Sequence, residues 1–311
     1  MWRLISCLFT LSLILSAACN RGVTGNEPTD TPTSGSVTVC VDESYKLLFD
    51  TQEYTFESFY ENANVKIIYT DEKTSMQNMI NDSCKVVVIN RALTAEEKKY
   101  FEQHNLFPTQ TKIAEDAVAL VVNKENYDST LTVEQFKNIL LGVDSTWKQI
   151  NAASTNDKIN VVFDNPNSAN YRYMKDSLLQ GKEFSKNVFA VKSNPEVIDY
   201  VAQHKNSIGV LSVNWISDKD DSISRSFLKT IRVMGVRKFE DTKAYKPYQA
   251  YIATKDYPFC RSVYMINRQT RAGLGTGFVS FVAGNKGQMM ILKMGLIPAV
   301  APVRMVEINT N

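Results

Sequence analysis

The stretch DAVALVVNKEN at residues 116–126 decides the fold, because it is an apolar strand that ends in a polar turn. Residues 117–122 contain only Ala, Val and Leu, which is typical of a buried strand. A helix is predicted just beyond it, over 131–142. There Val133, Phe136, Ile139 and Leu140 recur at helical spacing, and Gly142 ends the helix.

The same alternation of strand and helix extends on both sides of this stretch. Apolar runs predict strands at 37–41, 65–69, 85–89, 158–163, 207–213, 231–236 and 263–267. Helical patterns fall at 44–60, 74–81, 94–104, 168–179, 195–204, 276–283 and 287–293. This order favours an α/β fold with mostly parallel strands. At 311 residues, one core is near its practical size limit, so two lobes are expected.

The N-terminus has the pattern of an export signal. Residues 1–18 carry one charge, Arg3, then an apolar run from Leu4 to Leu15 and small residues up to Cys19. The apolar run is too short to span a bilayer comfortably and suits a signal peptide better than a buried helix. The ending resembles a lipobox, although Ser16 stands where leucine is usual. We expect 1–18 to be a signal peptide and Cys19 to carry lipid, tethering the protein to a membrane of the periplasm or cell envelope.

Residues 19–36 then form the link to the folded part. From residue 20 the sequence reads NRGVTGNEPTDTPTSGS, which has too little apolar content to order itself, and it is interpreted as a flexible stalk.

Composition and motifs argue against an enzyme and against nucleic acid. The formal charge of +2 gives no reason to propose a nucleic-acid partner. The two histidines, His104 and His204, have no neighbouring nucleophile or metal-ligand spacing. Known nucleophile-elbow, nucleotide-loop and zinc-protease motifs are missing. The glycine cluster at 273–277 is interpreted as a loop and helix start. We therefore expect no catalysis, cofactor or metal.

Three cysteines, Cys40, Cys84 and Cys260, remain beyond the signal and the lipid site. In an oxidising compartment two of them can pair. Cys40 in the first strand and Cys84 just before a later strand are the candidate pair. Three free thiols are an equally good interpretation.

Six segments in order resemble the periplasmic phosphate-binding proteins of ABC transporters. They are NRALTAEE (90–97), DAVALVVNKEN (116–126), LTVEQFKNILLGVDSTWKQIN (131–151), DNPNSANYRYM (164–174), NSIGVLSV (206–213) and GNKGQMMILKMGLIPAV (284–300). The resemblance implies a two-lobe type II periplasmic binding protein fold with an interlobe cleft. Lobe one would be 37–122 plus 258–311, and lobe two would be 123–257. An ABC permease would be the partner, and phosphate the ligand.

The resemblance also implies where ligand groups should lie. The family's first hydroxyl turn falls at Ser44 and Tyr45, and its aspartate falls at Asn90. Its Ser-Gly-Thr falls at Ser168, Ala169 and Asn170. The expected arginine is replaced by Asp164, so Arg91 and Arg172 are the candidate substitutes, with solvated surface arginines as the alternative.

The replaced residues affect the choice of ligand. Asp42, Glu43 and Asp164 cannot all face a bound dianion, because unpaired carboxylates would repel it in a closed cleft. Either some of them point away or the ligand is not phosphate. Two functions follow: a binding protein that delivers phosphate or a related oxyanion to a permease, and a sensor or envelope interaction lipoprotein with a changed or lost site.

Overall fold

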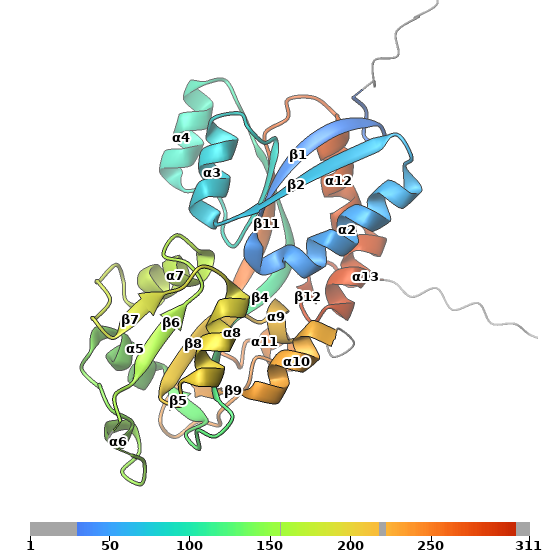
Figure 1. Cartoon of the computed structure of the whole chain (residues 1–311). Coiled ribbons are helices and arrows are strands. Elements are labelled where there is room, and N and C mark those ends of the chain that lie inside the picture. Colours follow the sequence, from blue (N-terminus) through green and yellow to red (C-terminus); the bar gives the residue numbers. More distant parts are fainter. Residues whose placement is uncertain (1–29, 156, 218–221, 303–311) are drawn as a thin grey trace, which may run out of the picture.

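The computed structural model describes residues 30–155, 157–217 and 222–302 as two α/β lobes joined by long strands (Figure 1). One lobe contains β1 (Gly35–Asp42), β2 (Ala63–Thr70), β3 (Val86–Ile89) and β11 (Cys260–Asn267). Its helices are α2 (Lys46–Phe59), α3 (Glu72–Ile80), α4 (Ala95–Gln103), α12 (Leu274–Ala283) and α13 (Asn285–Lys293). A short turn of helix, η1 (Glu43–Tyr45), and the two-residue strand β12 (Ile297–Pro298) complete it.

The other lobe is built on β6 (Asn160–Phe163), β7 (Val188–Ala190) and β8 (Ser207–Ser212). Short strands β5 (Thr130–Thr132), β9 (Ile231–Val233) and β10 (Gly235–Arg237) lie beside them. Its helices are α5 (Val133–Leu141), α6 (Trp147–Ile150), α7 (Ala169–Tyr173), α8 (Asn194–Gln203), α9 (Asn214–Ser217), α10 (Ser222–Thr230) and α11 (Gln249–Ala253). A wider helical turn, η2 (Met174–Leu178), continues α7.

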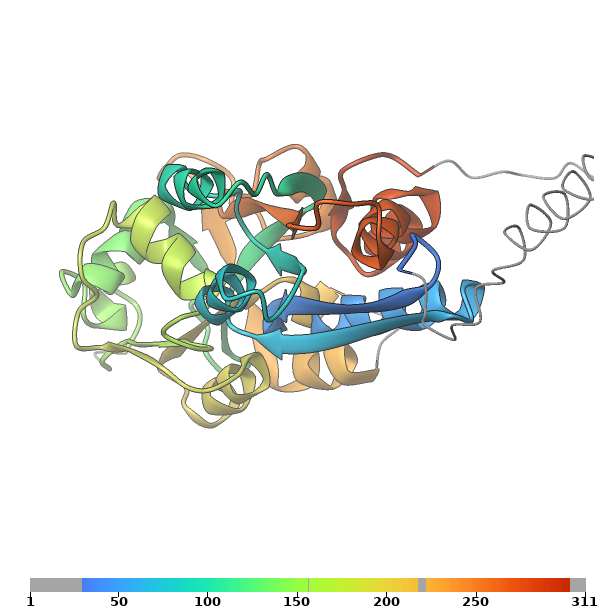
Figure 2. The ribbon, with the colours of Figure 1, turned by 90° about the horizontal axis from the view of Figure 1, so that it is seen from above.

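Strand β4 (Thr109–Asn123) runs through both lobes. Its first part pairs with β11 from Thr109 to Ala117, and its last part pairs with β8 from Val118 to Val122. The strand order is therefore β2-β1-β3-β11-β4-β8-β6-β7, one curled path through the molecule (Figures 1 and 2). The residues of β4 from Ala117 to Val122 are fully buried, as the apolar run predicted.

The sheet is more mixed than the sequence predicted. Strands β1, β2 and β3 are parallel, and so are β6, β7 and β8. Strands β4 and β11, however, pair antiparallel with each other and with their outer neighbours. The predicted strand 231–236 is two short strands, because β9 pairs with β4 while β10 pairs with β5.

Local signals placed several helices correctly. Thr94 and Glu97 form the predicted capping box of α4. Helix α5 ends at Gly142, whose φ of 76° is left-handed and suits glycine. Helix α2 buries Phe49 and Phe56 against Phe278 of α12, which anchors the long helix to lobe one. Within the described residues, no helix is long and apolar enough to cross a membrane.

Candidate functional site

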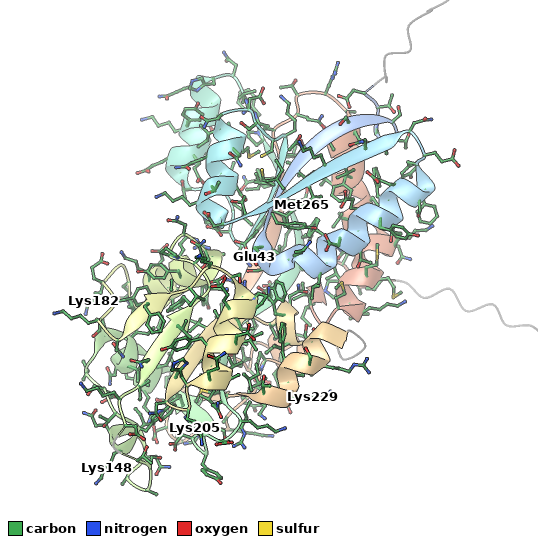
Figure 3. All side chains as sticks on the ribbon, viewed as in Figure 1. Glu43, Lys148, Lys182, Lys205, Lys229 and Met265 are labelled. Carbon is green, nitrogen blue, oxygen red and sulfur yellow. The ribbon has the colours of Figure 1, made fainter. Side chains whose placement is uncertain are left out.

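Three strand ends bring polar residues to the boundary between the lobes. Strand β1 ends at Asp42, β3 is followed by Asn90, and β6 is followed by Asp164. A cavity of about 420 Å³ lies there, lined from one side by Asp42 and Glu43 and from the other by Asp164 and Ser168. Figure 3 shows Glu43 between the two lobes. The carboxyl ends of strands in α/β sheets are where such folds bind ligands.

A buried cation, Arg261, lies at the point where β11 passes between the lobes. Its side chain is 2% exposed, and its Nε and Nη2 donate to Asp116 Oδ2 at 2.9 and 2.7 Å. Its Nη1 is buried and has no partner in the described part of the protein. Burial opposes the charge, but the Asp116 carboxylate outweighs it and raises the pKa of Arg261, so the guanidinium stays charged.

Residues from both lobes complete the surroundings of Asp116. The Tyr45 hydroxyl donates to Asp116 Oδ2 at 2.8 Å and accepts from Asn90 Nδ2. The Ser212 hydroxyl donates to the same oxygen at 3.1 Å. Two of the residues that the sequence proposed for the ligand site, Tyr45 and Asn90, are therefore bonded to the buried ion pair.

The unexpected Asp164 is held by donors of its own lobe. Its Oδ1 accepts from the Ser168 hydroxyl at 2.6 Å. Its Oδ2 accepts from Asn170 Nδ2 at 3.0 Å and Asn194 Nδ2 at 3.1 Å. Burial raises the pKa of Asp164 despite these hydrogen bonds. Asn170 Oδ1 and Asn194 Oδ1 are buried and have no partner in the described part of the protein.

Two further acids face this cavity from η1 and its cap. Burial raises the pKa of Asp42 to about 7, and the neighbouring charges of Asp164 and Glu72 add to the shift. Burial raises the pKa of Glu43 to about 7 as well, and the negative charges of Asp164 and Asp42 add to this shift. Asp42 Oδ1 accepts from Ser44 N at 2.9 Å, which fixes the turn. Near neutral pH these groups can hold protons, so the cleft need not carry all its formal negative charge.

The remaining residues proposed from the sequence lie in the same region. Ser44 is buried, and its carbonyl accepts from Asn214 Nδ2 at 3.0 Å. Ser168 also accepts from Tyr171 N at 3.2 Å and so caps α7, and Ala169 follows it, fully buried.

Arg91 and Arg172, the proposed substitute arginines, both bind Glu72 of α3. Arg172 Nε lies 2.5 Å and Arg91 Nε 3.0 Å from Glu72 Oε1. Arg91 also makes two bonds to Glu97, at 2.7 and 2.8 Å. The Arg172–Glu72 contact joins the two lobes beside a second cavity of about 460 Å³. The charge of both arginines is thus already balanced by carboxylates of this chain.

Sequence reasoning missed Arg261, Asp116 and Glu72 as members of the site. One signal was present: Arg261 is a charged residue shortly before the apolar run 263–266, close to the expected boundary between the lobes. Asp116 likewise precedes the apolar run of β4. Charges at such positions are rarely buried unless they are paired.

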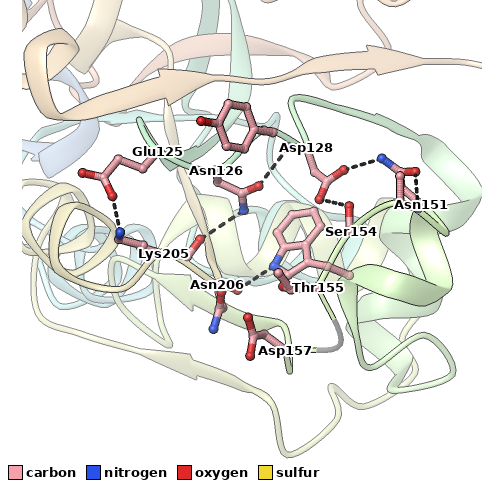
Figure 4. Close-up of a pocket in the computed structure, with 12 residues that line it drawn as sticks. Glu125, Asn126, Asp128, Asn151, Ser154, Thr155, Asp157, Lys205 and Asn206 are labelled. Carbon is pink, nitrogen blue, oxygen red and sulfur yellow. Dashed lines mark hydrogen bonds and ion pairs between the residues drawn. The ribbon is translucent and has the colours of Figure 1, made fainter.

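A separate cavity of about 460 Å³ lies at the far end of lobe two (Figure 4). Its polar groups bind one another: Glu125 pairs with Lys205, Asn151 Nδ2 donates to Asp128 at 2.9 Å, and Trp147 Nε1 donates to Asn206 at 3.2 Å. The interlobe cavity, whose neighbourhood holds several unpartnered buried groups, is the stronger candidate. In the described ranges no cluster of three or more His, Cys, Asp or Glu could hold a metal ion.

Comparison with known proteins places this architecture in a family. The family model of the PBP superfamily domain matches residues 26–286, and the chain belongs to that superfamily. Among curated proteins, the phosphate-binding protein PstS of Staphylococcus aureus strain USA300 is 26% identical over 203 residues. That alignment covers 64% of this chain and 59% of the relative, so the chain matches only part of the relative's length.

Solved structures show the same fold. A putative phosphate ABC transporter substrate-binding protein from Clostridium perfringens, with bound phosphate, matches with a TM-score of 0.70 at 20% identity. The match covers 86% of this chain and all of that one. An ABC-type phosphate transport receptor from Vibrio cholerae matches with a TM-score of 0.65 at 17% identity, covering 85% of this chain and all of that one. These likenesses confirm the type II binding-protein fold expected from the sequence.

Proposed function

We propose that this chain is an extracytoplasmic solute-binding lipoprotein that holds phosphate or a related oxyanion between its lobes and delivers it to an ABC permease. The named functions of the relatives support the ligand class and the permease. The proposed lobes are residues 37–122 plus 258–311 and residues 123–257. The proposed role is carriage of a ligand and not catalysis.

The observation that carries the oxyanion proposal is the unpartnered Nη1 of Arg261. A buried guanidinium whose other nitrogens are fixed by Asp116 offers a positioned, charge-assisted donor. Tyr45 and Asn90 are bonded to the same ion pair, and in lobe two the side chains of Ser168 and Asn170 donate to Asp164. Arg261 is therefore the proposed donor in place of the arginine lost at Asp164; its charge is offset by Asp116, and it lines another cavity, of about 490 Å³, and not the 420 Å³ one.

The acidic groups set a condition on the ligand. A dianion next to ionised Asp42, Glu43 and Asp164 would be strongly repelled. The pKa values of Asp42 and Glu43, raised to about 7, allow these two acids to be protonated near neutral pH, and a protonated carboxyl donates a hydrogen bond to an oxyanion. The proposed site therefore combines Arg261 and the cavity-lining cations Lys46 and Lys192 with acids that can act as neutral donors.

Calorimetry of the soluble protein, residues 20–311, with phosphate and sulfate tests the proposal. Arg261→Lys keeps a charge beside Asp116 but loses the planar fork, so phosphate should bind at least about tenfold more weakly. Arg271→Lys, on a side chain that is 75% exposed, is the matched control and should bind as the wild type does. No anion binding by the wild type would overturn the proposal, and equal affinity in Arg261→Lys would remove Arg261 from the site.

The membrane anchor is a separate part of the proposal. Cys19 lies outside the described residues, so its support is the sequence pattern alone. Cys19→Ala should release the product from the membrane fraction, and the wild-type product should show the mass of attached lipid. A membrane-bound variant together with an unlipidated wild type would contradict the lipid anchor, and it would leave the proposal of oxyanion binding unaffected.

A further inference from the structure

The residues just before β1 are bound to α12, although the sequence pattern assigns them to the stalk. Asp30 Oδ1 accepts from the backbone N–H of Leu274 at 2.8 Å, the first residue of α12. Asp30 Oδ2 forms an ion pair with Arg271 Nη2 at 3.1 Å. The helix N-cap, Gly273, has no side chain that could make this bond itself. A carboxylate at a helix N-terminus satisfies a free N–H and favours the helix dipole.

Glycines on α12 make room for this contact. A Cβ on Gly273 would lie 2.4 Å from Asp30 Oδ2, and a Cβ on Gly277, one turn later, would lie 1.7 Å from Pro32 O. At Gly277 the clash would be with backbone, so this approach requires glycine; at Gly273 the Asp30 carboxylate would have to move. Two glycines of the cluster at 273–277, Gly273 and Gly277, thus lie where the chain's own N-terminal segment passes closely.

The segment also has an internal fold. Thr31 N donates to Ser34 O at 2.9 Å, and the Thr31 and Ser34 hydroxyls are bonded at 2.8 Å, which closes a turn around Pro32. Gly35 N then donates to Asn62 O at 2.9 Å as β1 begins. Residues 30–35 therefore form an ordered segment with its own turn, joined at one end to α12 and at the other to the sheet.

We propose that residues 30–35 are an anchor segment that fixes where the membrane tether leaves the protein. With this segment bound, only residues 20–29 separate it from Cys19, and that length spans at most roughly 35 Å. Strand β1 runs from the anchor segment to Asp42 at the ligand cavity. The anchor segment therefore holds the α12 end of lobe one toward the lipid surface and lobe two away from it (Figures 1 and 2).

Hydrogen exchange on the soluble protein tests the anchor segment without any lipid. In the wild type the amides of Thr31, Ser34 and Leu274 should be protected. Asp30→Ala should raise the exchange rate of Leu274 roughly five- to tenfold by removing the cap. Gly277→Ala should displace the segment and raise the amide exchange rates of Thr31 and Ser34. Asp241→Ala removes the same charge from an exposed site in lobe two, and it should change neither the exchange rate of Leu274 nor that of Thr31 and Ser34. Wild-type exchange at Thr31 and Ser34 as fast as in an unstructured peptide would overturn the proposal.

Energy transfer to a labelled bilayer tests the orientation. Residues 19–311 carrying Cys260→Ser would be coupled through Cys19 to a maleimide lipid, so native lipidation is not needed; Cys40 and Cys84 are buried. A fluorescent amino acid replaces Lys148, which lies at the far end of lobe two (Figure 3). Transfer should be low in the wild type and rise in Asp30→Ala and Gly277→Ala, because a longer free tether lets lobe two approach the lipid. Equal transfer in all three proteins would contradict the orientation.

Discussion

At the scale of the residue, the site depends on how each buried charge is paired. Arg261 and Asp116 form a pair whose charges offset each other, with donors from Tyr45 and Ser212 around it. Asp164 has donors on both oxygens, whereas Asp42 has one on Oδ1, Ser44 N, and none on its buried Oδ2 among the residues that the structure describes. Burial raises the pKa of an acid that has few donors, so Asp42 is one residue at which pH should act.

We predict that stability falls as the pH rises from about 4 to about 7 because of Asp42. Its folded pKa of about 7 lies above the ordinary value, so the folded state holds a proton that the unfolded state has lost. The stabilisation is complete below the unfolded pKa and lost on passing the folded one, and amounts to a few kcal/mol in order of magnitude. Asp42→Asn should flatten this slope, as measured by urea unfolding at pH 5 and pH 8.

Glu43 needs a parallel measurement, since its pKa is also raised to about 7. Glu43→Gln should flatten a second part of the same slope. The matched control is Asp50→Asn on the exposed face of α2, which should keep the wild-type pH slope. An unchanged slope in both Asp42→Asn and Glu43→Gln would contradict the assignment.

A second residue-scale prediction concerns the cysteines, which are free thiols in the structure. Cys40 and Cys84 are buried in one cluster under α3, and Asn78 contacts both: its Nδ2 lies 3.5 Å from Cys40 Sγ and its carbonyl accepts from Cys84 N at 3.4 Å. A hydrogen bond from Cys84 lowers the pKa of Cys40 to about 7. After export, we expect these two to form a disulfide. Non-reduced peptide mass mapping should find it, with Cys260 free; three alkylatable thiols after denaturation would refute it.

At the scale of the element, two helices of lobe two start at residues that hold the buried Asp164. The cap of α7 is Ser168, which accepts from Tyr171 N at 3.2 Å and donates to Asp164 at 2.6 Å. The same hydroxyl therefore orders the first turn and satisfies a buried acid. Helix α8 begins beside it with Ser193 as cap, and Asn194 donates to Asp164 at 3.1 Å. The two helix starts of lobe two are thus joined through one carboxylate.

We predict that Ser168→Ala destabilises the protein by about 1–3 kcal/mol, because it removes the cap and one donor to Asp164. Ser193→Ala removes a comparable cap without touching Asp164, so its cost should be about 1 kcal/mol. Denaturant unfolding of both variants measures the difference. An equal loss of unfolding free energy in the two variants would show that the bond from Ser168 to Asp164 adds nothing to stability.

At the scale of the whole molecule, one ion pair spans the two lobes. Glu72 of α3 is buried, and it binds Arg172 of α7 across the cleft as well as Arg91 of its own lobe. Binding-protein lobes close by a hinge motion, and a contact made only in the closed form shifts that equilibrium. The Glu72–Arg172 pair is therefore expected to favour closure before any ligand enters.

We predict that Arg172→Ala opens the ligand-free protein. The lost contact is a charge-assisted, partly buried pair worth about 1–3 kcal/mol. Its loss would lower the equilibrium constant between the closed and open forms roughly five- to a hundredfold. Small-angle scattering should show a larger radius of gyration. Lys175→Ala, which removes a cation paired with Glu183 within lobe two, should leave the radius unchanged. A variant as compact as the wild type would exclude the pair as a closing contact.

The sequence by itself determined the class of fold. Apolar runs and capping boxes depend on residues a few positions apart, and these placed most strands and the start of α4 correctly. The order of six segments pointed to the binding-protein family, and the matched family model confirms it. The same resemblance, together with the predicted strand ends, is what assigned Tyr45, Asn90 and Ser168 to the proposed site.

Only the tertiary structure decided how the charges pair. Asp116 meets Arg261 across 145 positions, Arg172 meets Glu72 across 100, and Asp30 meets Leu274 across 244. Arg172, whose role the sequence left open, binds a carboxylate, and Asp30, which the sequence pattern assigned to the stalk, binds the N-terminus of a helix. Local patterns carry no information on such pairs, because the energy of a buried charge depends on which partner the folded chain brings within a few ångströms.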